Sequence, residues 1–259
     1  MKLCAVIPAA GRGSRLGIDV PKILAPISGN TTIWSILLDT VRPFVDHIHV
    51  ILAPTAVAAF SAVLAADSEG DRVTMSVQST PVGMGDAIFG ARSFWEPATT
   101  ILVIWGDQLH VSSDTLRATL ALHAGRPRCI GLPLVALPKP YVEYRFDSDG
   151  RLSAILQSRE GDNCRPGGFG DVGTFVLSTE GLAAAWDKYL PSAPRGIRTG
   201  EVNFLPFLVF LSTLGWEVRC HHVTEVSEAR GINTPEDLAF FQSLYSSGKW
   251  RPVLKSKED

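Results

Sequence analysis

Short apolar runs alternate with helix-like segments up to residue 137, and this alternation restricts the possible folds more than any other feature of the sequence. Strands are predicted at 3–7, 48–52, 73–77, 100–105 and 129–137, and helices at 33–41, 55–66, 86–95 and 113–124. Alternating strands and helices are typical of a mainly parallel sheet with helices on both faces. We therefore predict an α/β fold with a Rossmann-like, mainly parallel mixed sheet.

The pattern changes after residue 137. Residues 141–146 and 151–157, joined by a turn, predict a β-hairpin, and 171–177 predicts a further strand. Helices are predicted at 180–190 and 201–214, the second with a kink or a late start at Pro206, and a last strand at 216–223. We expect one domain over residues 1–247, divided into halves at 1–137 and 138–247, with a tail at 248–259.

The turn after the first strand holds glycines and basic residues. Gly11 and Gly13 permit backbone torsions that let consecutive N–H groups converge on an anion, and Arg15 and Lys22 add positive charge. The P-loop motif is absent because no Gly-Lys-Ser/Thr ends the turn, and the dinucleotide fingerprint is absent because position 16 is leucine. The turn predicts either a phosphate site of another kind or a plain strand-to-helix connection.

Two further strand ends carry polar groups. Gln78 and Gly83 lie in a second glycine-containing turn, where the glutamine amide suits either a base edge or the loop backbone. Asp107 follows the continuous apolar run 100–105 and suits either a Mg²⁺ ligand or an ordinary turn. Because ligands bind beyond the carboxyl ends of parallel strands, we expect these residues to face the first turn.

A predicted helix start lies close to Asn233. Thr234, Pro235 and Asp237 predict a capped helix, which explains these residues structurally and leaves Asn233 free to offer an oxygen ligand. His221 and His222 are neighbours in a predicted strand and point to opposite faces, so we do not expect them to bind a metal together.

The composition favours a soluble protein with a sizeable core. Hydrophobic residues make up 46% and charged residues 19%, and the net charge is −2, so no general basic field attracts nucleic acid. No apolar run approaches the ~20 residues of a membrane span, and no signal-peptide pattern is present. The widely spaced cysteines argue against a zinc site or disulfides. We expect a cytoplasmic protein that contacts neither membrane nor nucleic acid, with a homo-oligomer left open.

The segment from Ala9 to Arg15, followed by Pro21 and Lys22, resembles the signature of sugar-1-phosphate nucleotidylyltransferases. The likeness is greatest to the uridylyltransferase domain of the bifunctional N-acetylglucosamine-1-phosphate enzymes, and isoprenoid-pathway cytidylyltransferases carry a related version. It implies that a nucleoside triphosphate is bound by Ala9, Ala10, Gly11, Gly13, Gln78 and Gly83, that Arg15 and Lys22 hold its phosphates, and that Asp107 and Asn233 bind Mg²⁺.

This resemblance implies a Mg²⁺-dependent nucleotidyltransferase of the NDP-sugar pyrophosphorylase class, with Arg15, Lys22 and Asp107 as catalytic residues. A nucleoside triphosphate and a sugar-1-phosphate, or a sugar-like cyclitol phosphate, would give an NDP-sugar and pyrophosphate. The half at 1–137 would bind the nucleotide and the half at 138–247 the sugar phosphate. The alternatives are a cytidylyltransferase acting on a polyol phosphate and a non-catalytic nucleotide-sugar-binding module.

Several positions depart from the family pattern. Gln157 and Asp171 replace a glutamate and an asparagine that contact the sugar, so we expect both to bind the sugar phosphate and to disfavour N-acetylglucosamine-1-phosphate, unless loop shifts move them out of the site. Met84 replaces a common threonine, which leaves the nucleotide open, and Asn203 to Pro206 replaces Tyr-Leu-Thr-Asp. No hexapeptide repeats occur, so we expect no β-helix and no acetyltransferase activity.

Overall fold

The computed structural model describes residues 2–11, 13–67, 70–80, 82–198 and 200–248, so residues 249–259 of the predicted tail lie outside it. Its main sheet has the strand order β5-β4-β1-β6-β11-β7-β10-β8-β9, with β12 also paired to β7. The strands are β1 (Leu3–Ala9), β4 (His47–Leu52), β5 (Val73–Val77), β6 (Thr100–Ile104), β7 (Cys129–Ala136), β8 (Val142–Phe146), β9 (Leu152–Gln157), β10 (Phe169–Asp171), β11 (Thr174–Ser178) and β12 (Glu217–Val223). A separate small pair consists of β2 (Pro26–Ser28) and β3 (Thr31–Thr32).

The sheet is mixed and its nucleus is parallel. Parallel pairing joins β5, β4, β1 and β6, whereas β11 runs antiparallel between β6 and β7. On the other side of β7, β12 pairs in the parallel sense. The predicted fold class is confirmed.

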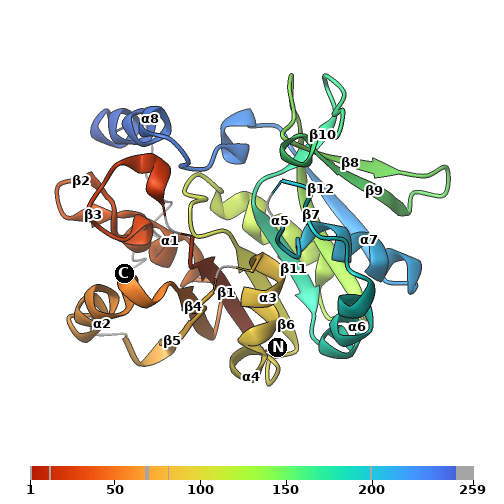
Figure 1. Ribbon diagram of the computed structural model, residues 1–259, viewed down its shortest axis with the longest axis horizontal. Helices are drawn as coiled ribbons and strands as arrows, with labels where there is room; N and C mark the ends of the chain where they lie inside the picture. Colours follow the sequence, from red (N-terminus) through yellow and green to blue (C-terminus); the bar gives the residue numbers. More distant parts are fainter. Residues whose placement is uncertain (1, 12, 68–69, 81, 199, 249–259) are drawn as a thin grey trace, which may run out of the picture.

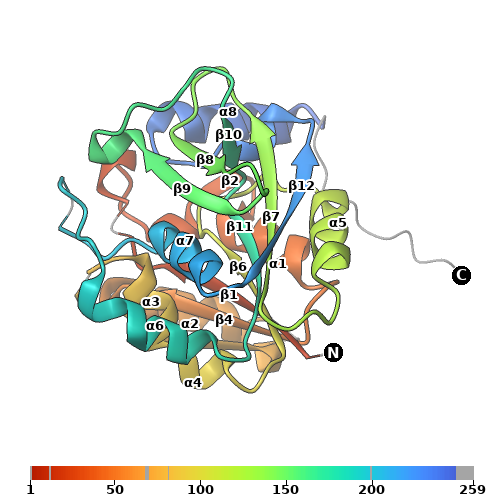
Figure 2. The same ribbon diagram turned by 90° about the vertical axis from the view of Figure 1, so that its right-hand side faces the viewer.

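Helices cover both faces of this sheet, as Figures 1 and 2 show. The helices are α1 (Ile33–Val41), α2 (Val57–Ala65), α3 (Met84–Gly90), α4 (Arg92–Trp95), α5 (Ser113–His123), α6 (Leu182–Tyr189), α7 (Leu205–Thr213) and α8 (Pro235–Ser246). Along β1, Leu3, Ala5 and Ile7 pack in the core beneath α1, α2, α5 and α8, whereas Cys4 and Val6 pack beneath α3, α4, α6 and α7. A strand buried on both faces must be apolar throughout, which is why the sequence shows continuous apolar runs. Among the described residues, no helix is long and apolar enough to span a membrane.

Helix starts follow the predicted local chemistry. Thr32 caps α1, with its hydroxyl accepting from the Ser35 N–H at 3.2 Å. Thr234 caps α8 in the same way, and the Asp237 carboxylate accepts a hydrogen bond from the Thr234 N–H at 3.0 Å. The same carboxylate accepts the N–H of Asn233 at 3.0 Å, so the cap also fixes the backbone of Asn233. Helix α7 begins at Leu205 with proline in its first turn, which confirms the late start.

Two predicted elements are each divided in two. The strand predicted at 171–177 breaks at Gly173, whose φ is 70°, so β10 pairs with β7 and β8 while β11 pairs with β6 and β7. The helix predicted at 86–95 is interrupted at Ala91 between α3 and α4. Neither break was signalled by composition, because the backbone follows contacts made elsewhere in the sheet.

A buried carboxylate fastens the β8–β9 hairpin to the segment that follows it. Glu143 of β8 is 0% exposed and accepts hydrogen bonds from the side chain of Arg145 at 3.0 Å and from Nε of Arg165 at 2.7 Å. The backbone N–H of Arg165 also donates to Glu143 at 2.7 Å. These bonds, that from Arg145 foremost, lower the pKa of Glu143 to about 2. The folded protein therefore favours the ionised carboxylate.

We predict that Glu143→Gln destabilises the protein at neutral pH and that the difference from wild type narrows in acid. The pKa of Glu143 is about 2 in the folded chain and 4.5 ordinarily, so its stabilising effect is complete above the ordinary value and declines as the pH falls toward 2. Urea unfolding from neutral to acidic pH measures the difference. Glu217→Gln, at a half-exposed residue that pairs with Arg219, is the control and should have little effect. A penalty for Glu143→Gln that does not change with pH would contradict the ionic explanation.

Candidate functional site

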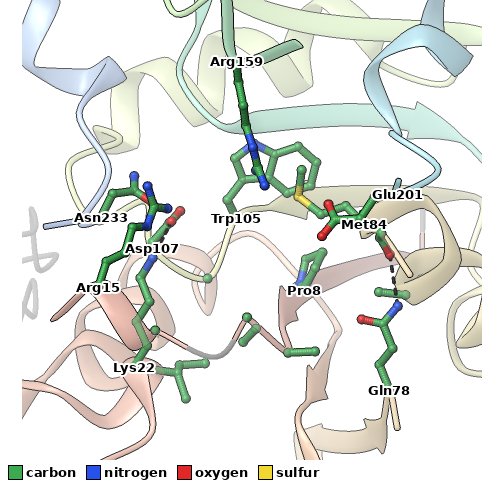
Figure 3. Close-up of a pocket in the computed structure, with 18 residues that line it drawn as sticks. Pro8, Arg15, Lys22, Gln78, Met84, Trp105, Asp107, Arg159, Glu201 and Asn233 are labelled. Atoms are coloured by element: carbon green, nitrogen blue, oxygen red, sulfur yellow. Dashed lines mark hydrogen bonds and ion pairs between the residues drawn. The ribbon is translucent and has the colours of Figure 1, made fainter. Parts of the chain in front are cut away.

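A cavity of about 490 Å³ opens where β1, β5 and β6 end (Figure 3). This volume is in the range of small-molecule sites. It is lined by Pro8, Ala9, Ala10, Gly11, Gly13, Arg15, Lys22, Ile23, Gln78, Gly83, Met84, Ala87, Trp105, Gly106, Asp107, Arg159, Glu201 and Asn233. The predicted phosphate, base and metal residues are therefore brought together, whereas Gln157 and Asp171 are not among the lining residues.

The first glycine turn closes tightly onto the segment that carries Lys22. Gly13 has a φ of 60°, and a Cβ at this position would lie 3.0 Å from the Cβ of Lys22. The chain continues through two short 3₁₀ turns, Ser14–Leu16 and Lys22–Leu24, and the first α-helix begins only at Ile33. The turn is thus not a plain strand-to-helix connection, which was the alternative interpretation.

Two cationic side chains meet two oxygen-bearing side chains at one end of the cavity. Lys22 Nζ lies 2.7 Å from Asp107 Oδ2, and an Arg15 guanidinium nitrogen lies 3.3 Å from Asn233 Oδ1. Figure 3 shows the four side chains together on one side, with Gln78 on the opposite side. The Lys22 and Asp107 side chains are only 16% and 24% exposed, so their ion pair is partly shielded from water. Three segments that are distant in sequence, the loop with Arg15 and Lys22, the segment after β6 and the segment before α8, therefore form one charged wall.

Asp107 and Asn233 provide the oxygen atoms that Mg²⁺ prefers as ligands. In the structure these oxygens contact Lys22 and Arg15, so a bound cation would replace those contacts. Within the described residues, no group of three or more His, Cys, Asp or Glu side chains is placed to hold a metal ion. Two protein oxygens fit Mg²⁺, because this ion usually keeps several waters and completes its shell with substrate phosphates.

At the other end of the cavity, the amide of Gln78 is held in one orientation. Its Nε2 donates to the carbonyl of Gly83 at 3.0 Å and to Asp86 Oδ2 at 2.8 Å. A carbonyl and a carboxylate can only accept, so the nitrogen must face them and the oxygen Oε1 must face away. The amide therefore offers the cavity an acceptor.

Three cavity-lining residues with aromatic or charged side chains were not predicted from the sequence. Trp105 immediately precedes Gly106 at the end of β6, and Arg159 and Glu201 come from loops of the second half. Figure 3 shows Arg159 reaching over Trp105 from above, with Glu201 at the side. Trp105 could have been found as the last residue of the apolar run before Asp107. No sequence signal marks Arg159 or Glu201, because the paths of their loops depend on contacts with distant segments.

Gln157 and Asp171 occupy other surroundings. Asp171 Oδ2 accepts from the hydroxyl of Tyr144 at 3.0 Å, and Oδ1 accepts from the N–H of Gly173 at 2.7 Å. Burial raises the pKa of Asp171. Gln157 ends β9 and its N–H donates to Asp162 at 2.8 Å. One carboxylate oxygen of Asp171 thus serves the bend between β10 and β11, and the other binds a hydroxyl of β8. A role of Gln157 or Asp171 toward a sugar phosphate stays a prediction.

The fold, and a cavity lined by two cationic side chains, two oxygen-bearing side chains and the Gln78 amide, are those of a nucleotidyltransferase. Residues 5–136 match the MobA-like NTP transferase domain, and the chain belongs to this family. It is 27% identical over 252 residues to the bifunctional protein GlmU of Aquifex aeolicus (strain VF5), a match that covers 93% of this chain and 52% of the relative. GlmU of Paracidovorax citrulli (strain AAC00-1) is 25% identical over 256 residues, 98% of this chain and 52% of the relative. The chain thus spans about half the length of these relatives, and the predicted nucleotidylyltransferase resemblance is confirmed.

Solved structures share the fold. A putative glucose-1-phosphate thymidylyltransferase of Bacillus anthracis superposes with a TM-score of 0.73 at 15% identity, over 93% of this chain and 94% of the other. A 4-diphosphocytidyl-2C-methyl-D-erythritol synthase of Anaerococcus prevotii DSM 20548 gives a TM-score of 0.65 at 16% identity, over 95% and 96%. Identities this low establish the fold alone.

We predict that Gly83→Ala weakens triphosphate binding. Gly83 has a φ of 129°, and a Cβ here would lie 2.4 Å from the carbonyl oxygen of Val202, so the loop that orients Gln78 would have to move. An incompatible backbone substitution of this kind costs more than about 1 kcal/mol. If the displaced loop must return to its native position for the triphosphate to bind, this cost raises KM roughly fivefold. Gly90→Ala, in α3 with no atom within 4 Å of the added carbon, is the matched control and should keep the wild-type KM. An unchanged KM in Gly83→Ala would contradict this role.

Proposed function

We propose that this protein transfers a nucleoside monophosphate from a nucleoside triphosphate to the phosphate of a sugar, or of a sugar-like alcohol such as a cyclitol, with release of pyrophosphate. The observation that supports this most is the convergence of Lys22 with Asp107 and of Arg15 with Asn233 in a cavity whose far end presents the Gln78 amide. A nucleoside triphosphate would extend from the Gln78 amide to the two cations. It would pass along the glycine turn, where Ala9, Ala10, Gly11 and Gly13 would bind it.

The chemistry asks for positioning and charge neutralisation. An oxygen of the acceptor phosphate attacks the α-phosphorus, and the bond from this phosphorus to pyrophosphate breaks. A phosphate is already anionic at neutral pH, so no general base is required. Arg15 would neutralise the leaving pyrophosphate, and Lys22 would bridge the α-phosphate and the incoming phosphate. Mg²⁺ held by Asp107 and Asn233 would add charge neutralisation at the phosphates.

The acceptor would bind against the second half of the cavity wall. Arg159 carries a guanidinium that suits a phosphate, and the Glu201 carboxylate suits hydroxyl groups. The Trp105 indole, which lines the same cavity, offers a flat apolar surface. On this proposal the half at 1–137 holds the nucleotide and the half at 138–247 the acceptor.

The orientation of Gln78 supports a preference among bases. Uracil, thymine and guanine carry an N–H at the central ring position of the Watson–Crick edge, where cytosine and adenine have a bare nitrogen. On this proposal the Gln78 oxygen faces that central position, where an amide that can only accept matches the first group, whereas cytosine and adenine would have to meet it with their exocyclic amino group. Placing the Gln78 oxygen against a bare ring nitrogen leaves a polar group unsatisfied, at a cost of about 1–3 kcal/mol.

We therefore expect uridine, thymidine or guanosine triphosphates to exceed cytidine and adenosine triphosphates in kcat/KM by about 10- to 100-fold. Asp86→Ala removes one acceptor that fixes the amide and should shrink this ratio. Asp187→Ala, which removes another exposed aspartate with a side-chain partner, Arg92, is the control and should preserve it. A wild-type preference for cytidine triphosphate would contradict the argument.

Lys22→Ala should lower kcat by about 10²–10³-fold and leave KM for the triphosphate nearly unchanged, because negative charge concentrates near this amine in the transition state. Steady-state kinetics with each substrate varied in turn measure kcat and KM. Lys188→Ala, an exposed lysine of α6, controls for loss of surface charge. A raised KM with unchanged kcat would instead make Lys22 a simple binding residue.

Release of pyrophosphate tests the proposed function as a whole. The purified protein with Mg²⁺ is assayed against the common triphosphates and a panel of sugar-1-phosphates and cyclitol phosphates, N-acetylglucosamine-1-phosphate included, and mass spectrometry identifies the product. We expect one pair to be turned over, and Asp107→Ala or a chelator to abolish turnover. Equal pyrophosphate release by Asp107→Ala, or none with any pair, would overturn the proposal.

A further inference from the structure

The two oxygen ligands at the charged wall come from segments that share no strand or helix. Asp107 follows β6, and Asn233 precedes α8. The carbonyl of Asp107 accepts the N–H of Ile232 at 3.0 Å, and a Cβ at Gly231 would lie 3.4 Å from both the carbonyl oxygen and Oδ1 of Asp107. The relative position of the two ligands therefore depends on how these two segments are joined.

A buried glutamine provides one join. Gln108 is 4% exposed, and its Nε2 donates to the carbonyl of Glu228. Its Oε1 is enclosed by glycines: a Cβ would lie 3.0 Å from this oxygen at Gly173 and 3.4 Å from it at Gly231. A side chain at either glycine would crowd the amide, which is held by its bond to the Glu228 carbonyl.

A buried glutamate of the second segment provides a further link, through its side chain, to the backbone of the first segment. Glu228 is 5% exposed, and its carboxylate accepts the N–H of Ser112 at 3.0 Å. Ser112 caps α5 with its hydroxyl, so this bond attaches the Glu228 segment to a helix start. The two bonds cross: the side chain of Gln108 reaches the backbone of the second segment, and the side chain of Glu228 reaches the backbone of the first.

We propose that Gln108 and Glu228 are positioning residues that hold Asp107 and Asn233 at the spacing a divalent cation requires. This inference rests on the proposed function, because it takes these two residues as the cation ligands. Neither Gln108 nor Glu228 lines the cavity, so neither has a direct contact to offer a substrate. Without the crossed bonds, the backbone bond from Ile232 to Asp107 is left to hold the two segments near the ligands. Loss of outer supporting contacts around a metal site typically weakens metal binding by about 10- to 100-fold.

Binding of Mn²⁺ alone, measured through the relaxation rate of water protons, tests the inference without any turnover. Gln108→Met keeps the length of the side chain and removes the donor, and we expect it to weaken Mn²⁺ binding by about 10- to 100-fold. Glu228→Ala should have a similar effect from the other segment, whereas Glu228→Gln keeps an acceptor oxygen and should restore binding close to wild type.

The matched control is Gln242→Met. The Gln242 amide also donates to the backbone of a distant segment, the carbonyl of Pro26 at 3.1 Å, but this bond joins α8 to β2 and does not link the segments that carry Gln108 and Glu228. It should leave Mn²⁺ binding unchanged, even if thermal unfolding shows the same loss of stability as in Gln108→Met. A loss of Mn²⁺ binding in Gln108→Met that Gln242→Met does not share, at equal stability, supports positioning.

Asp107→Asn separates failure of this inference from failure of the proposed metal site. If wild type binds Mn²⁺ more tightly than Asp107→Asn, while folded Gln108→Met and Glu228→Ala bind it as wild type does, the positioning role is wrong and the metal site stands. If Asp107→Asn binds Mn²⁺ as wild type does, Asp107 is not a cation ligand, and both the metal site and the positioning role fall.

Discussion

The parallel pairing of β1 with β6 is the constraint on which the site depends. Val6 stands opposite Val103, so the two strands leave the sheet at the same edge. Gly106, which comes just after β6, lies so close to the end of β1 that a Cβ on it would be 2.8 Å from the Cβ of Ala9. The N–H of Gly106 donates to the Pro8 carbonyl at 3.2 Å. The glycine turn and Asp107 are therefore neighbours because of the sheet, before any attraction between their side chains contributes.

The elements that could be predicted from the sequence are those determined by local chemistry. Continuous apolar runs became strands buried on both faces, and Thr32 and Thr234 cap helices with groups three residues away. The break at Gly173 could not be predicted, because the change of partner from β6 to β8 depends on strands that lie far away in the sequence.

The same distinction applies to the site. Gln78 and Asp107 were found because each lies at a strand end that the sequence marks, whereas Arg15, Lys22 and Asn233 were found through the resemblance of their segments to a known family. Arg159 and Glu201 were missed because long-range contacts set the course of their loops: the N–H of Val202 donates to the carbonyl of Val82 at 3.0 Å, and that of Arg198 donates to Glu160 at 3.0 Å. Asp171 could not be interpreted from the sequence for another reason. Its carboxylate binds groups of the protein, and in a sequence such an aspartate looks the same as one that binds a ligand.

The partial burial of the Lys22–Asp107 pair has a consequence for the form in which a phosphate compound can enter. A free anion that draws Lys22 toward itself leaves the Asp107 carboxylate unpaired beside another negative charge, in a region with little water to compensate. On the proposed function, an anion that arrives already complexed with a divalent cation would let Lys22 turn to the phosphate while Asp107 turns to the cation. The resting ion pair would then favour metal-chelated phosphates over bare ones.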